Sequence, residues 1–332
     1  MPIKILVSGA AGDTAQGILK ALKGSALDVE LYTTCIHKHS SWLHVEENSF
    51  IAPLSADEGY VDYLIRLIRR FGIQVYFPTV DSEIAKITGE KARIERETGA
   101  SVFTDDVQKV SVCDDKIHTA EFLQSNDFAY PKSIAAEDPA ARDFATGLGF
   151  PVIAKKRCGQ GSQNVYRVDD PGQLKQYCGD PTFILQERLD PALGEYTTGL
   201  YLGDDGAIKG VCTFRRILRG GTTFIAERII DSALEKPLEN MALKLGMKYL
   251  NIQSIRRGDE LVPFEFNGRL SGSTAMVAKV FNAPEMFIRE RLLGESLDRV
   301  DDKSIFVAMR YYEEVYAAPK QIDSLEKRSA EI

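Results

Sequence analysis

The chain has 332 residues, of which 44% are hydrophobic and 27% are charged, and its formal net charge is -7. This is an ordinary balance for a globular protein long enough to hold more than one domain, and the acidic charge excludes an overall basic field that would attract nucleic acid or an anionic membrane. Five cysteines are scattered without a C-x-x-C pair, which favours reduced thiols over a disulfide framework or a zinc site.

The first third of the chain alternates between strand and helix patterns. This alternation indicates a parallel sheet in an α/β domain of roughly residues 1 to 110. The apolar run at the start predicts a strand rather than a signal peptide, and the sequence holds no run of 18 apolar residues, so we expect a cytoplasmic protein. The expected elements are strands at 3–7, 28–36, 73–83 and 100–105 and helices at 14–23, 62–72 and 83–98.

A glycine turn follows the first strand, with Gly9, Gly12 and Gly17 in the spacing G-x-x-G-x4-G. The dinucleotide fingerprint is G-x-G-x-x-G with an acidic residue near the end of the second strand, whereas residues 33–35 here are Thr-Thr-Cys. Because a tight turn before a helix requires glycine whether or not it binds a ligand, we interpret this turn as structural.

Beyond residue 110 the pattern changes to hairpins, which predicts α+β character. The Gly-Asp-Asp-Gly at 203–206 and the Arg-Gly-Asp at 257–259 are both turn signals between long strand patterns. The last residues, 322–332, are polar, and we expect them to be loosely ordered. The expected elements are a helix within 114–133, strand, glycine-rich loop and strand within 150–170, strands within 182–217, a helix at 238–247 and a hairpin at 249–269.

The glycine-rich loop at 159–162 follows a strand that ends in Lys155, Lys156 and Arg157. Backbone N–H groups on such a loop, with a lysine beside them, suit a polyphosphate, although a charged hairpin tip is the alternative. Glu187 at a strand end and Glu195 before the next strand are, taken alone, typical of solvated carboxylates.

The strand at 262–269 places Glu265 and Asn267 on one face, because they are two residues apart. The hairpin is expected to bring Gln253 to their level. A carboxylate and amides are oxygen ligands of the kind that Mg²⁺ prefers over zinc. Arg269 continues this face and could grip a transferring phosphoryl group with two hydrogen bonds. A wet face on an edge strand is the alternative.

In this order the motifs resemble the ATP-grasp superfamily: a D-K helix, "PV-x-x-K" before a glycine loop, "Q-E…G-E-Y-T" and "E-x-N-x-R". The likeness is to the ATP-binding half of the carbamoyl-phosphate synthase large subunit and its small stand-alone relatives. It implies an α/β and α+β chain with the ATP-grasp fold. The domains it implies are a Rossmann-like pre-ATP-grasp domain at 1–110, an N-lobe with a glycine-rich lid hairpin at 111–185 and a C-lobe with Mg²⁺-binding strands at 186–332.

The resemblance also implies roles for individual residues. It assigns ATP phosphates to Lys155 and Lys116, and the ribose hydroxyls to Glu195. The strand at 186–189, with Gln186, Glu187 and Leu189, would contact adenine through backbone groups, with Glu187 near the adenine amino group. Lys155 and Lys156 stand where many members have Lys-Pro, so the phosphate lysine is one of these two; the "PVIxK" run favours Lys155.

The resemblance makes Gln253, Glu265 and Asn267 the ligands of Mg²⁺, with Mn²⁺ as an alternative, and places Arg269 against the γ-phosphate and an acyl phosphate. The family often reads E-x-N-P-R, whereas Gly268 stands in place of the proline here, which loosens the backbone without removing a ligand. A separate basic run, at 214–223, predicts a loop that could hold an anionic substrate, or alternatively a solvated hairpin.

The implied function is an ATP-dependent carboxylate–amine ligase that acts through an acyl phosphate and releases ADP and phosphate. Its partners would be a small-molecule carboxylate and an amine, with no nucleic acid and no membrane, and a homodimer is left open. The alternative hypothesis is a nucleotide-binding regulatory or scaffold protein of the same fold without ligase activity. An NAD(P)-dependent oxidoreductase that uses the glycine turn is the least favoured.

Overall fold

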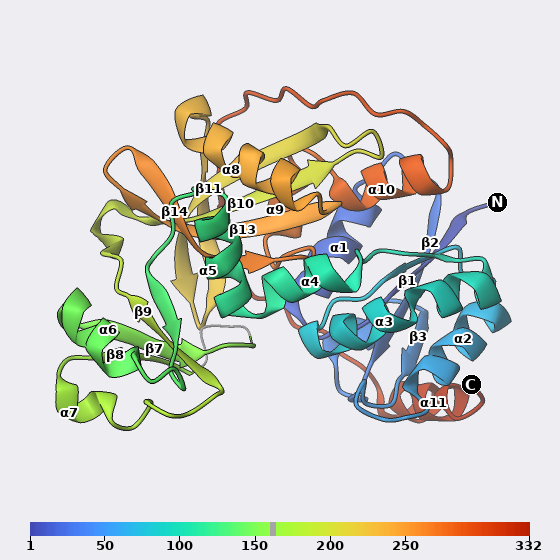
Figure 1. The fold of residues 1–332 in the computed structure, drawn as a ribbon. Helices are drawn as coiled ribbons and strands as arrows, with labels where there is room; N and C mark the ends of the chain where they lie inside the picture. The colour runs from blue at the N-terminus through green and yellow to red at the C-terminus, as the bar shows by residue number, and fades with distance from the viewer. Residues whose placement is uncertain (160–163) are drawn as a thin grey trace.

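The computed structural model describes residues 1–159 and 164–332, and its strands form three sheets (Figure 1). The first sheet is parallel, in the order β3-β2-β1-β4-β5, as the alternating pattern predicted. Only β3 was not expected, because its four residues lie in a polar stretch. The elements are β1 (Ile3–Val7), α1 (Asp13–Lys23), β2 (Val29–Cys35), η1 (Ser41–His44), β3 (Asn48–Ile51), α2 (Tyr60–Phe71), β4 (Val75–Phe77), α3 (Asp81–Thr98) and β5 (Ser101–Val102).

The second sheet is antiparallel, in the order β6-β9-β7-β8, and forms a small lobe with α6 and α7 (Figure 1). The expected strand, loop and strand are β7 and β8, but residues 160–163 of the predicted glycine-rich loop lie outside the described residues. The elements are α4 (Val107–Asp114), α5 (Lys116–Ser125), β6 (Ser133–Ala135), α6 (Ala141–Leu148), β7 (Val152–Lys156), β8 (Val165–Val168), α7 (Pro171–Leu174) and β9 (Phe183–Glu187).

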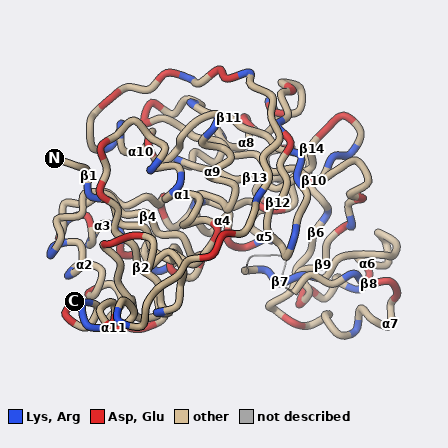
Figure 2. The backbone as a smooth tube through the Cα atoms, turned by 180° about the vertical axis from the view of Figure 1, so that it is seen from behind, with Lys and Arg blue, Asp and Glu red and all other residues tan. Residues whose placement is uncertain are grey.

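The third sheet is antiparallel, in the order β14-β13-β10-β11-β12-β15, and both predicted hairpins are confirmed as β10–β11 and β13–β14. Figure 2 shows the chain between α10 and β15 as a long arch that carries acidic and basic residues. The elements are η2 (Pro191–Leu193), β10 (Glu195–Leu202), β11 (Ile208–Arg219), β12 (Thr222–Ile229), α8 (Ser232–Leu245), β13 (Tyr249–Arg257), β14 (Glu260–Asn267), α9 (Thr274–Val277), α10 (Ala283–Arg291), β15 (Val307–Met309) and α11 (Pro319–Ser329).

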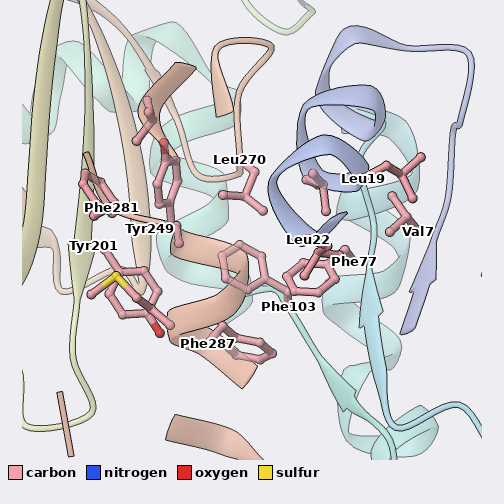
Figure 3. Close-up of a cluster of buried hydrophobic side chains, with 14 of the residues drawn as sticks. Val7, Leu19, Leu22, Phe77, Phe103, Tyr201, Tyr249, Leu270, Phe281 and Phe287 are labelled. Atoms are coloured by element: carbon pink, nitrogen blue, oxygen red, sulfur yellow. The ribbon is translucent and has the colours of Figure 1, made fainter. Parts of the chain in front are cut away.

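One hydrophobic core joins the first and third sheets. Val7 and Phe77 of the first sheet belong to the same buried cluster as Tyr201 and Tyr249 of the third, and Phe287 of α10 lies between them (Figure 3). Each such fully buried side chain contributes on the order of 1.5–3 kcal/mol. This shared core fixes the glycine turn after β1 against the end of β14. The domain boundaries at 110 and 185 stay a prediction.

The glycine turn is required by its geometry. Gly9 has φ +63°, and a Cβ atom there would lie 2.6 Å from the Thr79 side-chain oxygen, so a larger residue would clash as well as strain the backbone.

The prediction that residues 322–332 are loosely ordered is wrong. They include most of α11, whose Leu325 is fully buried against Leu43. The backbone N–H of Ile51 donates to the Ser329 hydroxyl at 2.8 Å, which ties the helix to β3. The segment has a single strongly buried apolar side chain, so its order comes from tertiary contacts that a polar composition does not reveal. Across the described residues, no helix combines the length and apolarity needed to span a membrane.

Candidate active site

A cavity of about 690 Å³ lies between the second and third sheets. It is bordered by β7 and β9 on one side and by β10, β13 and β14 on the other. Eight of the sequence-predicted site residues line it together, although they come from segments up to 150 residues apart. These are Lys116, Lys155, Gln186, Glu187, Leu189, Glu195, Gln253 and Glu265.

Lys155 on β7 reaches across the cavity from one sheet to the other. Its side chain is buried, at 4% exposure, and its Nζ donates to the Phe264 carbonyl oxygen of β14 at 3.2 Å. Burial lowers the pKa of Lys155 to about 7; Glu265 opposes this shift and Lys116 adds to it. An ammonium in this place is poorly compensated by the protein, so an anionic ligand would stabilise its charged form.

Lys156, the neighbouring candidate, directs its ammonium elsewhere. Its Nζ lies 4.2 Å from the centre of the Phe183 ring and donates to the Thr182 hydroxyl. Strand alternation therefore makes Lys155 the lysine whose ammonium reaches β14.

Lys116 begins α5, directly after Asp115, whose carboxylate caps the helix by accepting from the Ile117 N–H at 2.9 Å. The Lys116 Nζ donates to the carbonyl oxygens of Arg157 and Gly159, at 3.2 and 3.0 Å. It thus holds the chain where the glycine-rich segment begins, on the same side of the cavity as Lys155.

The end of β9 contributes mainly backbone to the cavity. Glu187 binds Lys132, the residue before β6: its N–H donates to the Lys132 carbonyl at 2.8 Å and its carboxylate accepts from the Lys132 N–H at 3.1 Å. Gln186 is 5% exposed and donates to the Ser133 hydroxyl at 2.8 Å. With both side chains engaged by Lys132 and Ser133, the segment on to Leu189 offers its main-chain groups to a planar ligand.

Arg216 is a site residue that sequence reasoning misplaced. The basic run at 214–223, predicted to be a loop or alternatively a hairpin, forms the β11–β12 hairpin, and Arg216 lies within β11 opposite Glu195. Its Nε donates to Glu195 Oε1 at 3.1 Å, and its Nη2 donates to Gln253 Oε1 at 2.8 Å. The oxygen that Gln253 was expected to offer a metal therefore accepts from a guanidinium.

A β-bulge at Tyr201 and Leu202 decides which arginine faces the site. Leu202 is opposite Ile208, but Tyr201 is opposite Gly210. If the register continued from Leu202 without this one-residue shift, Glu195 would be opposite Arg215 instead of Arg216. Arg215 instead points to the other face of the sheet, 3.9 Å from Glu227. The turn signal at 203–206 could have located Arg216 only if the bulge had been known.

Glu265 and Asn267 lie on one face of β14, as predicted. The Asn267 amide donates to Glu265 Oε1 at 3.2 Å, and Gln253 is opposite Glu265 in the register with β13. The carboxylate and the amide oxygen together fit a hard divalent cation such as Mg²⁺. In the described part of the chain, no group of three or more His, Cys, Asp or Glu side chains forms an alternative metal site.

Arg269 follows β14 and links it to the first sheet. Its guanidinium pairs with Asp81, the first residue of α3, and donates to the Leu270 carbonyl at 3.1 Å. Together with Asn267, it lines a second cavity of about 260 Å³ that also includes Glu265 and extends to the glycine turn at the start of α1. All the predicted site residues thus border one of two adjoining cavities.

Comparisons with known proteins agree on the fold. No family model matches the chain. It is 25% identical over 236 residues to the carbamoyl phosphate synthase large chain of Rubrobacter xylanophilus, covering 62% of this chain and 21% of that protein. It is 24% identical over 240 residues to the arginine-specific large chain of Bacillus subtilis, covering 66% and 23%. The chain therefore spans less than a quarter of the length of these relatives.

Among solved structures, the chain is similar to N5-carboxyaminoimidazole synthetase from Staphylococcus aureus complexed with ADP, with a TM-score of 0.72, 15% identity and coverage of 100% and 87%. It is also similar to the biotin carboxylase domain dimer of 2-oxoglutarate carboxylase from Hydrogenobacter thermophilus, with a TM-score of 0.71, 14% identity and coverage of 92% and 74%. These similarities show that the fold is the ATP-grasp fold, so the resemblance in the sequence motifs is confirmed.

Proposed function

We propose that this chain, whose fold is the ATP-grasp fold, is an ATP-dependent carboxylate–amine ligase that forms an acyl phosphate and releases ADP and phosphate. One observation carries the proposal: the buried Nζ of Lys155 donates to the carbonyl of Phe264 on β14, the residue before Glu265, and the Glu265 carboxylate accepts from Asn267 on the same strand. A cation for phosphates and an oxygen pair for a divalent metal therefore meet at one point of the cavity.

The nucleotide occupies the 690 Å³ cavity in this proposal. Lys155 and Lys116 bind its phosphates, the main chain at 186–189 contacts adenine, with Glu187 at the amino group, and Glu195 accepts from the ribose hydroxyls. The neighbours support this role, because the Staphylococcus aureus synthetase was solved with ADP and the Hydrogenobacter thermophilus domain with ADP and its magnesium salt.

Glu265 and Asn267 would hold Mg²⁺, with Mn²⁺ as a substitute, and Gln253 joins them once its Oε1 leaves Arg216. When bound, the metal neutralises charge on the transferring phosphoryl group. Arg269, fixed by Asp81, supplies a rigid cation beside the reacting oxygens. Phosphate transfer to a carboxylate creates a good leaving group, and attack by an amine then forms the amide and releases phosphate.

The 260 Å³ cavity would take the acceptor carboxylate. It is smaller than the roughly 300–1,000 Å³ of pockets for drug-sized ligands, and serine and threonine hydroxyls contribute much of its lining. None of its described lining residues is aromatic. These properties favour a small polar acceptor, such as an amino acid or a sugar carboxylate, over one that needs ring stacking.

We also propose that the chain forms a homodimer.

A second candidate function, nucleotide binding without ligation, is favoured by one observation. The Gln253 oxygen accepts from Arg216, so the chain holds a cation where the resemblance places a third metal ligand.

ADP release by the purified chain, measured with Mg²⁺ across panels of carboxylates and amines, separates these two functions. Ligation predicts ADP that depends on both substrates and a product with the mass of an amide. Release of AMP and pyrophosphate would contradict the acyl-phosphate route, and nucleotide binding without turnover would favour the second function.

Two variants on one strand test the site itself. Glu265→Ala should abolish turnover, since it removes the metal carboxylate. Glu260→Ala is the matched control, because Glu260 is exposed on β14 and pairs with Arg257 outside the cavity. Equal activity in the two variants would mean that the metal assignment is wrong.

A further inference from the structure

The outer edge of the third sheet carries an apolar surface on its solvent side. In the segment around β15, alternate residues are exposed although all are apolar: Ile305 is 81% exposed, Val307 52%, Met309 67% and Tyr311 80%. Of the residues between them, Phe306 and Ala308 pack against the shared core, whereas Arg310 forms an ion pair with Asp13. A surface edge strand normally shows polar residues on its outer face, whereas residues 305–309 are apolar on both faces.

The surface extends across two further strands. Met309 is opposite Ile225 of β12, and Ile225 is opposite Ile217 of β11, which is 58% exposed. These cross-strand pairs form a continuous apolar row over three strands. We call this surface the β15 patch; its members are Ile217, Ile225, Ile305, Val307, Met309 and Tyr311.

Helix α8 covers the neighbouring part of the same sheet face, and the patch begins where this cover ends. Tyr196, opposite Arg215, is buried in the cluster formed with α8. One row further, Arg215 and Glu227 form an exposed ion pair, with Val307 opposite Glu227. The patch is therefore bordered by one cation and one anion on adjacent strands. Within the described residues, β15 is the last strand on this side of the sheet.

We propose that the β15 patch is covered by the same patch of a second copy of this chain, packed sheet against sheet about a two-fold axis. With side-chain areas on the order of 150–200 Å², the exposed fractions amount to roughly 550 Å² of apolar surface per copy. That is at the upper end of the largest patches on monomers, about 300–600 Å², and is about two thirds of the ~800 Å² per partner of a standard interface.

A second copy of this chain fits the β15 patch better than a different protein with a strong net charge. A two-fold axis brings the same surface of both copies together, so each contact must complement itself. The apolar rows satisfy this condition directly. The Arg215–Glu227 pair satisfies it because Arg215 of one copy can face Glu227 of the other. The surface is on the opposite face of the sheet from Arg216 and the cavities, so this proposal does not depend on ligase activity.

Sedimentation equilibrium of the full chain over about 1–50 μM tests the proposal. The expected result is a mass twice that of one chain. Val307→Lys with Met309→Lys should raise the dimer dissociation constant about 100-fold or more, because the four lysines would meet across the axis. Val107→Lys is the matched control, since Val107 is a valine with 58% exposure on α4, away from the patch; it should leave the dimer intact.

Ile217→Lys provides an independent variant on another strand if the double variant does not fold. Arg215→Glu alone should weaken the dimer, and adding Glu227→Arg should restore it. A wild-type chain that stays monomeric over this range overturns the proposal. So does a dimer that persists in both lysine variants, or a series of open-ended higher oligomers. Nucleotide binding should be the same in all variants, since none of them touches the cavities.

Discussion

Nucleotide binding should take up a proton, because Lys155 has a pKa of about 7 in the free protein. At pH 8 most of the buried amine is neutral, and bound phosphates would restore its charge and raise its pKa toward the usual 10.5. Binding at pH 8 should therefore take up about one proton, and affinity should fall about tenfold between pH 8 and pH 9. Below pH 7 the lysine is already charged, so this dependence should disappear.

Titration calorimetry with ADP in two buffers of different ionisation enthalpy measures the proton directly. Working at pH 8 and above keeps the nucleotide phosphates fully ionised, so that uptake by the protein alone is seen. Lys155→Met should lose both the proton uptake and most of the affinity. Lys156→Met, whose ammonium lies over the Phe183 ring, should keep both. Heats that do not depend on the buffer in the wild-type chain, or uptake that persists in Lys155→Met, would mean that Lys155 does not take up a proton when the nucleotide binds.

Three further outcomes follow from the same structure. Lys155→Met should raise the free energy of unfolding by a few kcal/mol at pH 7, measured by urea unfolding, because it removes a buried charge. The pKa of Lys155 in the folded protein, about 7, lies below the usual 10.5. The buried charge therefore destabilises the fold fully below pH 7, and this destabilisation decreases as the pH rises toward 10.5. Gly9→Ala should lower the free energy of unfolding by about 1–3 kcal/mol in the same assay, since the new Cβ meets Thr79 at positive φ. Arg216→Met should lower the Mg²⁺ concentration for half-maximal ADP release several-fold, because it removes a cation and frees Gln253; an unchanged Mg²⁺ dependence would show that the two groups do not compete.

The sequence carries most of the site, because strand alternation is a local property. Glu265 and Asn267 are two residues apart, so their common face could be predicted without knowing what β14 packs against. The two hairpins were predictable from another local property, the turn residues at 203–206 and 257–259. The resemblance then gathered segments that periodicity alone cannot bring together, such as Lys155 and Glu265.

What could not be predicted depends on contacts between distant segments. Helix α11 is ordered by Leu325 and Ser329 against the first sheet, and its own composition is that of a mobile tail. The pairing of Arg216 with Gln253 depends on a bulge, which has no local sequence signal here. The Asp81 partner of Arg269 comes from 188 residues away and becomes visible only when the first and third sheets are packed together.

The bulge at Tyr201 and Leu202 determines which arginine of β11 lies on each face of the third sheet. Arg216 faces the side of the sheet with Glu195 and the larger cavity, and Arg215 faces the β15 patch, only because of this one-residue offset. If the bulge were straightened at unchanged chain length, so that Lys209 paired with Tyr201, the two arginines would exchange faces, and both the predicted metal site and the proposed subunit contact would change. Changes that straighten the bulge without changing the length of the hairpin should therefore be poorly tolerated, and relatives that pair the residue equivalent to Glu195 with the preceding arginine are expected to differ in both properties.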